Sequence, residues 1–122
     1  MEFDYLSSNW FRLFKKQWFL ATFVISLIFN AALWLLLIAK APPTTESVPL
    51  HYSLTFGIDW LGGWGGLFIY PVMGFLLICL NTYLSIIIQS INKFLSLILM
   101  LLPAFAHVIV GISIYMLLRN YY

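Results

Sequence analysis

The chain has 122 residues, of which 63% are hydrophobic and only 8% are charged, and its formal net charge is +2. Soluble globular domains carry about 25% charged residues, and a soluble chain this apolar would expose surfaces that aggregate. The composition and the mean hydropathy of +0.99 therefore indicate one integral membrane domain. Its 6 basic residues are too few and too scattered to form a nucleic-acid-binding surface, so nucleic acid is excluded as a partner.

The N-terminal segment, residues 1–17, has an amphipathic pattern. The aromatic residues Trp10 and Phe14 recur at helical spacing with Trp18, which opens the first apolar run. The basic residues of the same stretch are Arg12, Lys15 and Lys16. A segment of this kind lies in the headgroup plane and is attracted to anionic lipid. We expect it to anchor the chain at the membrane surface, and binding of a cytosolic partner is the alternative.

Three apolar runs, residues 18–39, 67–88 and 94–118, contain no Asp, Glu, Lys or Arg. Each reaches the roughly 20 helical residues that cross a bilayer. In hydrocarbon every backbone N–H and C=O must be bonded within the segment, so each run is predicted to be a helix. The expected fold is therefore all-α with three transmembrane helices, and the first is too long for a cleaved signal peptide. The short link after residue 88 makes the second and third helices antiparallel neighbours.

The positive charges predict the orientation of these helices. With the N-terminus inside, one side of the membrane holds Arg12, Lys15, Lys16 and Lys93. The other side holds Lys40 and Arg119. Short cytoplasmic segments carry the excess of Lys and Arg. We therefore expect a multi-pass protein of the plasma (inner) membrane with its N-terminus in the cytoplasm and its C-terminus outside.

The predicted outer loop, residues 40–66, changes character after Pro49. From Leu50 to Trp60 apolar and polar residues alternate, which is typical of an amphipathic extended strand. One face would be apolar, and the other would carry His51, Ser53, Thr55 and Asp59. A lone strand leaves its backbone unpaired, so it must fold back near Gly57, pair with another chain, or lie in the membrane interface. The glycine-rich run 62–66 is interpreted as a flexible hinge, with close backbone approach as the alternative.

The residues Val48-Pro49-Leu50-His51-Tyr52, followed by Gly57 and Asp59, carry a family resemblance. They resemble the outer-loop motif in the domain of unknown function of the sporulation-delaying-protein immunity family. They are also similar to a Pro-x-His-Tyr…Phe-Gly-Ile-Asp signature of small uncharacterised bacterial membrane proteins. The resemblance covers the first helix, the loop and the second helix. It implies a bacterial inner-membrane protein with a structured outer loop.

The candidate functional residues of this loop are His51, Tyr52, Gly57 and Asp59. His51 and Asp59 can meet only if the strand folds back, and a hydrogen bond that staples the loop is then expected before a catalytic pair. A metal site needs three or four convergent ligands, and no ligand spacing links the His, Asp and Glu residues. No nucleophile–base pair, phosphate loop or dinucleotide fingerprint is present, so the sequence predicts no catalytic residue, no metal and no cofactor.

Polar or small residues recur in each predicted helix at a spacing of about four. They are Thr22, Ser26, Asn30 and Trp34 in the first, Gly74, Asn81 and Ser85 in the second, and Pro103, His107 and Gly111 in the third. Helices in lipid associate through such residues, so these stripes are expected to face one another. Asn30 and His107 lie at similar depth and Asn81 nearer the cytoplasm. A neutral His107 bonded to Asn30 is the structural reading, and a proton or substrate relay is the functional one.

These features favour a non-enzymatic interaction protein, either an accessory subunit or a homo-oligomer. The alternative is an oligomeric transport or channel component whose pathway is lined by Asn30, Asn81 and His107. A second alternative is an envelope immunity or sensing protein, which rests on the loop resemblance alone. The expected partners are the lipid bilayer and either a second copy or another membrane protein.

Overall fold

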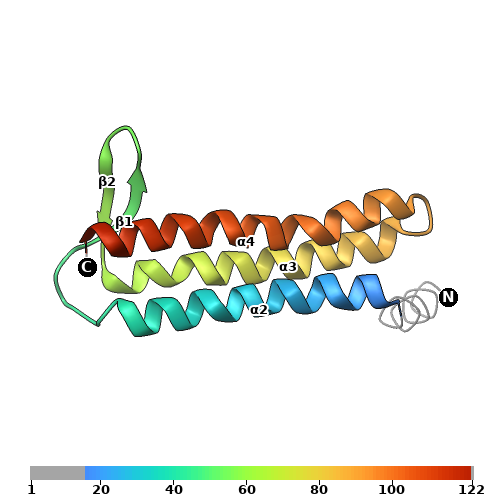
Figure 1. The fold of residues 1–122 in the computed structure, drawn as a ribbon, viewed down its shortest axis with the longest axis horizontal. Coiled ribbons are helices and arrows are strands. Elements are labelled where there is room, and N and C mark those ends of the chain that lie inside the picture. The colour runs from blue at the N-terminus through green and yellow to red at the C-terminus, as the bar shows by residue number, and fades with distance from the viewer. Residues whose placement is uncertain (1–15, 122) are drawn as a thin grey trace.

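The computed structural model describes residues 16–121 as a bundle of three long helices with a β-hairpin at one end (Figure 1). The helices are α2 (Gln17–Lys40), α3 (Ile69–Ile88) and α4 (Lys93–Tyr121). The hairpin consists of β1 (Val48–Ser53) and β2 (Gly57–Gly62), and a 3-10 helix, η1 (Trp64–Phe68), leads into α3. The predicted amphipathic segment, apart from its last two residues, lies outside the described residues.

All three helices are long and apolar enough to cross a membrane, over Gln17–Lys40, Trp64–Ile88 and Lys93–Tyr121. The three predicted runs are thus confirmed as helices. Two boundaries differ from the prediction by more than one residue: the last helix continues to Tyr121, and the second begins with a 3-10 turn before Ile69. At 1.5 Å per residue the 24 residues of α2 extend about 36 Å, which exceeds the roughly 30 Å of a hydrocarbon core.

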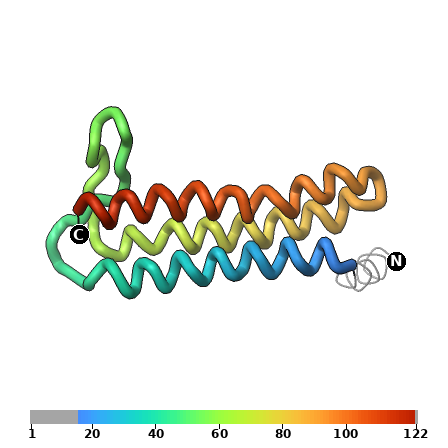
Figure 2. The backbone as a smooth tube through the Cα atoms, viewed as in Figure 1, coloured from blue at the N-terminus to red at the C-terminus, as the bar shows by residue number. Residues whose placement is uncertain are grey.

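The helices lie side by side, and each contacts the other two (Figure 2). The loop between α3 and α4 is short, and the Asn92 side chain caps α4 by accepting the backbone N–H of Leu95 at 3.1 Å. The predicted antiparallel pairing of these two helices is therefore confirmed. α2 and α4 both end beside the hairpin, at the end of the bundle opposite the start of α2.

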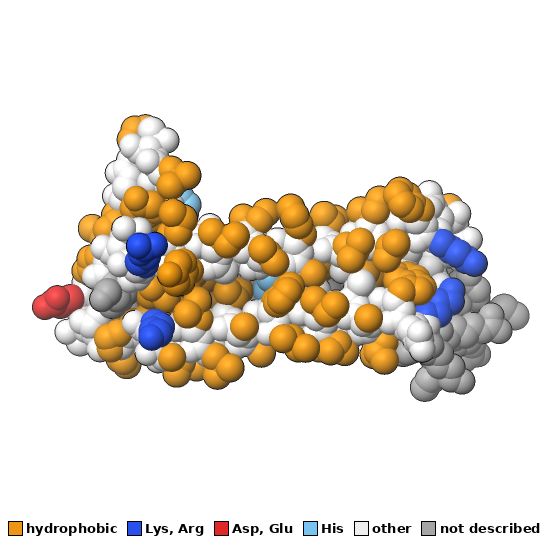
Figure 3. All heavy atoms as spheres, in the orientation of Figure 1, with side chains coloured by type: hydrophobic (Ala, Val, Ile, Leu, Met, Phe, Trp, Pro, Cys, Tyr) orange, Lys and Arg blue, Asp and Glu red, His pale blue; other side chains and the backbone are white. Residues whose placement is uncertain are grey.

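The surface of the bundle is the reverse of a soluble protein's surface. Hydrophobic side chains cover its length, and basic side chains lie at the two ends (Figure 3). Polar side chains are buried between the helices, namely Thr22, Ser26, Asn30, Asn81, Thr82, Ser85, Ser96 and His107. This confirms the prediction that the polar stripes face inward. Such an arrangement is the one expected of helices packed in lipid, where polar contacts join helices and apolar groups face outward.

The largest cluster of buried apolar side chains ties the hairpin to the bundle. Leu33 and Leu37 of α2 and Ile114 and Leu117 of α4 pack in one cluster with Leu50 of β1. The indole N–H of Trp64 also donates to the carbonyl of Ala41 at 2.9 Å, which joins η1 to the end of α2. The first half of β1 is therefore a buried part of the fold, although it lies in a predicted surface loop.

The hairpin confirms one of the three alternatives for the outer strand and corrects one detail. The chain folds back, and Gly57, with φ of +71°, occupies a left-handed conformation that glycine adopts readily. The expected division into an apolar and a polar face is wrong. The antiparallel register shifts twice, leaving Leu50 and Asp59 without paired residues, because local bulges re-aim these side chains. Consequently Leu50 is buried, whereas Trp60 and Leu61 are exposed.

Two glycines of the glycine-rich run approach β1 closely, whereas a Cβ atom added at Gly63 or Gly65 would meet no atom within 4 Å. A Cβ atom added at Gly62 or Gly66 would lie 2.5 Å or 2.9 Å from Leu50 Cδ1. The alternative interpretation, close backbone approach, therefore applies at these two positions. The absence of their side chains makes the space in which Leu50 is buried.

Candidate functional site

A polar contact joins all three helices near the middle of the bundle. The side-chain amide nitrogen of Asn30, on α2, lies 2.8 Å from the carbonyl oxygen of Pro71 on α3. The same nitrogen lies 3.1 Å from Nε2 of His107 on α4. His107 Nδ1 lies 2.6 Å from the carbonyl oxygen of Pro103. The predicted pairing of Asn30 with His107 is thus present, and Pro71 completes it.

These contacts determine which nitrogen of His107 carries the proton. The carbonyl of Pro103 can only accept, so Nδ1–H donates to it. The Asn30 amide nitrogen faces the Pro71 carbonyl, which fixes the amide orientation, and its second N–H donates to Nε2. A proton on Nε2 would place two donors against each other. The neutral imidazole therefore matches the site, which supports the structural reading of His107 over the proton relay.

Gly74 of α3 makes this three-helix contact possible. A Cβ atom added there would lie 2.6 Å from His107 Nε2 and 3.1 Å from Asn30 Nδ2. Real Cβ atoms essentially never approach another atom so closely, so a side chain would displace the imidazole or the amide. The small residue in the predicted stripe is thus part of the polar site.

Asn81 belongs to a separate site, nearer the α3–α4 loop. Pro103 has no N–H, so the carbonyl of Leu99, four residues earlier, lacks its normal helical donor. The side chain of Asn81 donates to this carbonyl at 3.0 Å. Asn81 therefore compensates for the proline in α4. The three predicted intramembrane residues do not converge, because only Asn30 and His107 meet.

A pair of serines closes the loop end of the bundle. The hydroxyl of Ser85 donates to the carbonyl of Ser96 at 3.0 Å, and the hydroxyl of Ser96 donates to the carbonyl of Ser85 at 3.1 Å. Both side chains are fully buried. In lipid such contacts between helices contribute about 0.6 kcal/mol on average. Among the described residues, the Ser26 hydroxyl is the one buried side-chain group that lacks a hydrogen-bond partner.

Ser96 and Pro71 were missed by the sequence reasoning, although one signal points to Ser96. In an antiparallel helix pair, residues equally distant from the loop midpoint face each other. Ser85 and Ser96 are equally distant in sequence from the midpoint between Ser90 and Ile91, so they are expected to lie opposite each other. By the same count Gly74 matches His107. Pro71 contributes only its carbonyl, which no pattern of side chains reveals.

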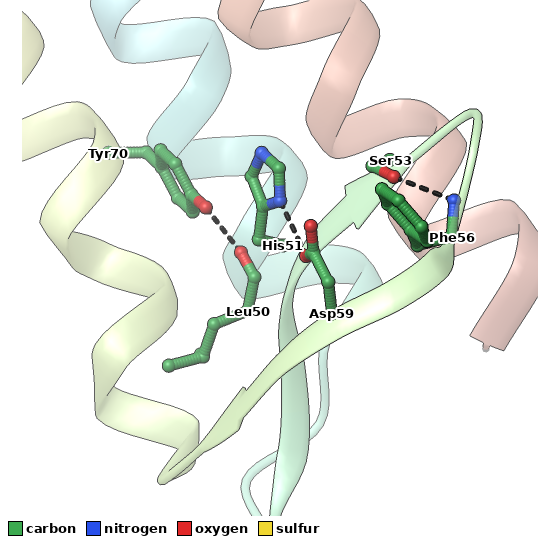
Figure 4. A network of polar contacts seen from close by, with 6 residues as sticks. All are labelled: Leu50, His51, Ser53, Phe56, Asp59 and Tyr70. Atoms are coloured by element: carbon green, nitrogen blue, oxygen red, sulfur yellow. Dashed lines mark hydrogen bonds and ion pairs between the residues drawn. The ribbon is translucent and has the colours of Figure 1, made fainter.

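Two of the outer-loop candidates, His51 and Asp59, meet in the hairpin, beside two further polar contacts (Figure 4). His51 Nδ1 and Asp59 Oδ1 lie 2.6 Å apart, so the predicted stapling contact is present. The Tyr70 hydroxyl donates to the carbonyl of Leu50, and the Ser53 hydroxyl accepts the backbone N–H of Phe56 at 2.9 Å. These contacts join β1 to β2, to α3 and to the turn, and each therefore supports the fold of the hairpin.

Of the other two loop candidates, Tyr52 is partly buried against the apolar cluster and Gly57 begins β2 after the turn. The His51 and Asp59 side chains are 52% and 36% exposed, so they reach solvent. Within residues 16–121, no group of three or more His, Cys, Asp or Glu side chains could hold a metal ion. Only His51 and Asp59 of the four loop candidates are therefore brought together, and their contact is a structural one.

Two hollows lie along α3 and α4 beside these sites. The larger, about 340 Å³, is bordered by Tyr70, Gly74, His107 and Val110. The smaller, about 200 Å³, lies beneath the hairpin and reaches His51. Tyr70 and Val110 border both hollows, and the linings are mostly apolar. Besides the two histidines, the titratable side chains in these linings are Tyr52 and Tyr70.

Searches for similar proteins found no matching family model, no matching curated protein and no matching solved structure. The resemblance to the immunity family therefore stays a prediction from the loop motif. The conclusions about function that follow rest on the residues and geometry of this chain.

Proposed function

We propose that this protein is a non-enzymatic accessory subunit of a bacterial cytoplasmic membrane that binds another membrane protein through its outer hairpin. The single observation that carries the proposal is the exposed apolar surface of the hairpin. Leu54 and Phe56 in the turn are 84% and 81% exposed, and Trp60 and Leu61 of β2 are 54% and 58% exposed. Apolar groups gathered on a projecting element are typical of a protein-binding surface.

The orientation of the hairpin supports this proposal. It projects sideways from the end of the bundle (Figure 1). In a membrane crossed by the three helices, it would therefore lie along the outer surface and face laterally neighbouring proteins. Each of its two strands has one edge unpaired by the other strand, and such edges accept a further strand.

The charges of the described residues are compatible with the proposed orientation. Lys16 and Lys93 lie at the loop end of the bundle, whereas Lys40 and Arg119 at the hairpin end are accompanied by acidic residues. Those acidic residues are Glu46 and Asp59. The excess of Lys and Arg that predicts a cytoplasmic loop end comes from Arg12 and Lys15, which precede α2 in the sequence and lie outside the described residues.

The bundle interior gives less support to the transport alternative. A water-filled pathway needs polar side chains that face it, but Asn30, Asn81 and His107 donate to or accept from groups of the same chain. Opening a pathway along them would break these bonds. The surface available for binding is therefore the hairpin and the lipid-facing side of the helices.

The proposal is tested by placing a photo-crosslinking amino acid at Phe56 in living cells, with Phe105 as the matched control. Phe105 is 66% exposed on α4, within the apolar span. We expect a protein adduct of one defined mass at position 56 and lipid adducts at position 105. A Leu54→Ser/Phe56→Ser variant should lose the corresponding complex in mild detergent while its free energy of unfolding changes by less than about 0.5 kcal/mol. Lipid adducts alone at position 56, with a strictly monomeric protein, would contradict the proposal.

A further inference from the structure

A groove between α2 and α4 shares no lining residue with the hairpin. Its upper part, at the hairpin end of the bundle, has a volume of about 330 Å³. It is lined by Leu36, Tyr115 and Leu118 with Lys40 and Arg119. Its lower part, also about 330 Å³, continues toward the bundle centre and ends at His107. Leu36 and Tyr115 border both parts, so the two parts adjoin along the seam between the helices, which we call the α2–α4 groove. Its volume lies in the range of small-molecule sites, about 300–1,000 Å³.

The length of the groove matches half of a bilayer. On α2 it extends from Lys40 to Phe29, which is about 16 Å at 1.5 Å per residue. Half of the roughly 30 Å hydrocarbon core is about 15 Å. One acyl chain of the leaflet at the hairpin end would therefore extend from the mouth of the groove to its lower end.

The mouth of the groove carries a net positive charge. Lys40 and Arg119 both line it, and within residues 16–121 neither side chain forms an ion pair. Both lie in the last turn of a helix, where the helix dipole contributes about half a negative charge per helix. The two full positive charges of Lys40 and Arg119 exceed the two half negative charges of the helix ends. The mouth of the groove therefore attracts an anion. An arginine also presents several N–H donors that match a phosphate.

The lower part of the groove is open because Gly111 has no side chain. A Cβ atom added there would meet only Leu33, at an ordinary contact distance of 3.6 Å. Position 111 therefore tolerates a side chain, and a large one would fill the groove. Gly74 does not tolerate a side chain in the same way, because an added Cβ atom would clash with His107 and press against Asn30.

From these features we infer that the α2–α4 groove binds one anionic phospholipid of the leaflet at the hairpin end. Its phosphate lies between Lys40 and Arg119, and one acyl chain lies along Tyr115 and over Gly111. The inference goes beyond the binding of a partner protein, since the groove and the hairpin turn are separate surfaces. It shares only the membrane position of the helices with the proposed function.

The test is native mass spectrometry of the delipidated protein in detergent, titrated with phosphatidylglycerol or with phosphatidylcholine of the same chains. The wild type should retain one phosphatidylglycerol in preference to phosphatidylcholine. A Lys40→Gln/Arg119→Gln variant should bind it about thirtyfold more weakly, since each basic residue near a membrane surface contributes about 1 kcal/mol and about 1.4 kcal/mol is tenfold. Gly111→Leu, which keeps both charges, should also weaken binding.

Two matched controls separate this site from general attraction between lipid and protein. Lys16→Gln/Lys93→Gln removes the same charge at the other end, where those lysines border a hollow that shares no residue with the α2–α4 groove. Ala31→Leu places the same leucine side chain at an exposed position of α2 outside the groove. Both should bind like the wild type. Equal loss of phosphatidylglycerol binding in the two charge variants, or unchanged binding in Gly111→Leu, would overturn the inference. Either result would leave the expected crosslink at Phe56, and so the proposed function, untouched.

Discussion

In the helix bundle, most buried polar side chains are bonded to side chains or carbonyls of neighbouring helices, and large apolar side chains cover the outer surface. In the hairpin, the His51–Asp59 contact is open to solvent, and apolar side chains project from the turn and from β2. The difference shows which contacts hold each region. Lipid gives helices no hydrophobic reason to associate, so buried polar bonds and close packing determine the bundle. The hairpin depends instead on the buried first half of β1, and its exposed groups are available for other roles.

The largest expected effect comes from closing the space at Gly74. Gly74→Ala places a methyl group where Asn30 and His107 meet, and we expect the free energy of unfolding to fall by about 2 kcal/mol. The matched control is Gly111→Ala, whose added methyl group meets only an ordinary contact. It should be neutral or stabilising by up to about 1 kcal/mol, because alanine favours helix. Unfolding in detergent measures both, and equal effects would show that the three-helix contact is not tightly packed.

A smaller effect is expected at Asn81, and its dependence on Pro103 is the decisive part. Asn81→Leu leaves the Leu99 carbonyl without a donor and should lower the free energy of unfolding by about 1–2 kcal/mol. In a Pro103→Ala background, the new backbone N–H at position 103 can donate to that carbonyl. The same Asn81→Leu change should then cost less than half as much. A double-mutant cycle with a coupling energy near zero would refute the compensation.

The helices were predictable from the sequence because hydrocarbon imposes one rule on every residue of a long run. Uncharged stretches of about 20 residues must be helical, and their polar residues must face inward, which places Asn30 near His107. The bond between Asn81 and the Leu99 carbonyl was not predicted. It depends on a backbone carbonyl freed by Pro103, which the pattern of side chains does not reveal.

The hairpin was less predictable, for a different physical reason. Alternation from Leu50 to Trp60 indicated an extended chain, and the meeting of His51 with Asp59 required a fold-back. The two register shifts were not visible in the pattern, because a bulge exchanges the faces of a strand without changing its composition. For the same reason the buried position of Leu50, against Gly62 and Gly66, could be found only from the structure.

The smallest effect is expected at the exposed contact of the hairpin. His51→Ala removes a hydrogen bond whose partners are 52% and 36% exposed, and water competes for both side chains. The loss should therefore be about 0.2–1 kcal/mol, the range measured for exposed pairs. Tyr70→Phe is the informative comparison, since its hydroxyl donates to the carbonyl of Leu50, a residue that is only 5% exposed. It should cost at least as much as His51→Ala, about 1 kcal/mol.

Thermal unfolding of the two variants in one detergent decides whether the hairpin is held by its open pair or by its buried attachment. If His51→Ala destabilised the protein more than Tyr70→Phe, the exposed His51–Asp59 contact would stabilise the hairpin more than its buried attachment to α3 does. The contrast between the two regions would then be wrong. If His51→Ala instead leaves unfolding nearly unchanged but reduces crosslinking at Phe56, the contact serves to hold the shape of the binding surface. That result would assign His51 and Asp59 to recognition, since a bond that adds little stability can still orient the turn that carries Leu54 and Phe56.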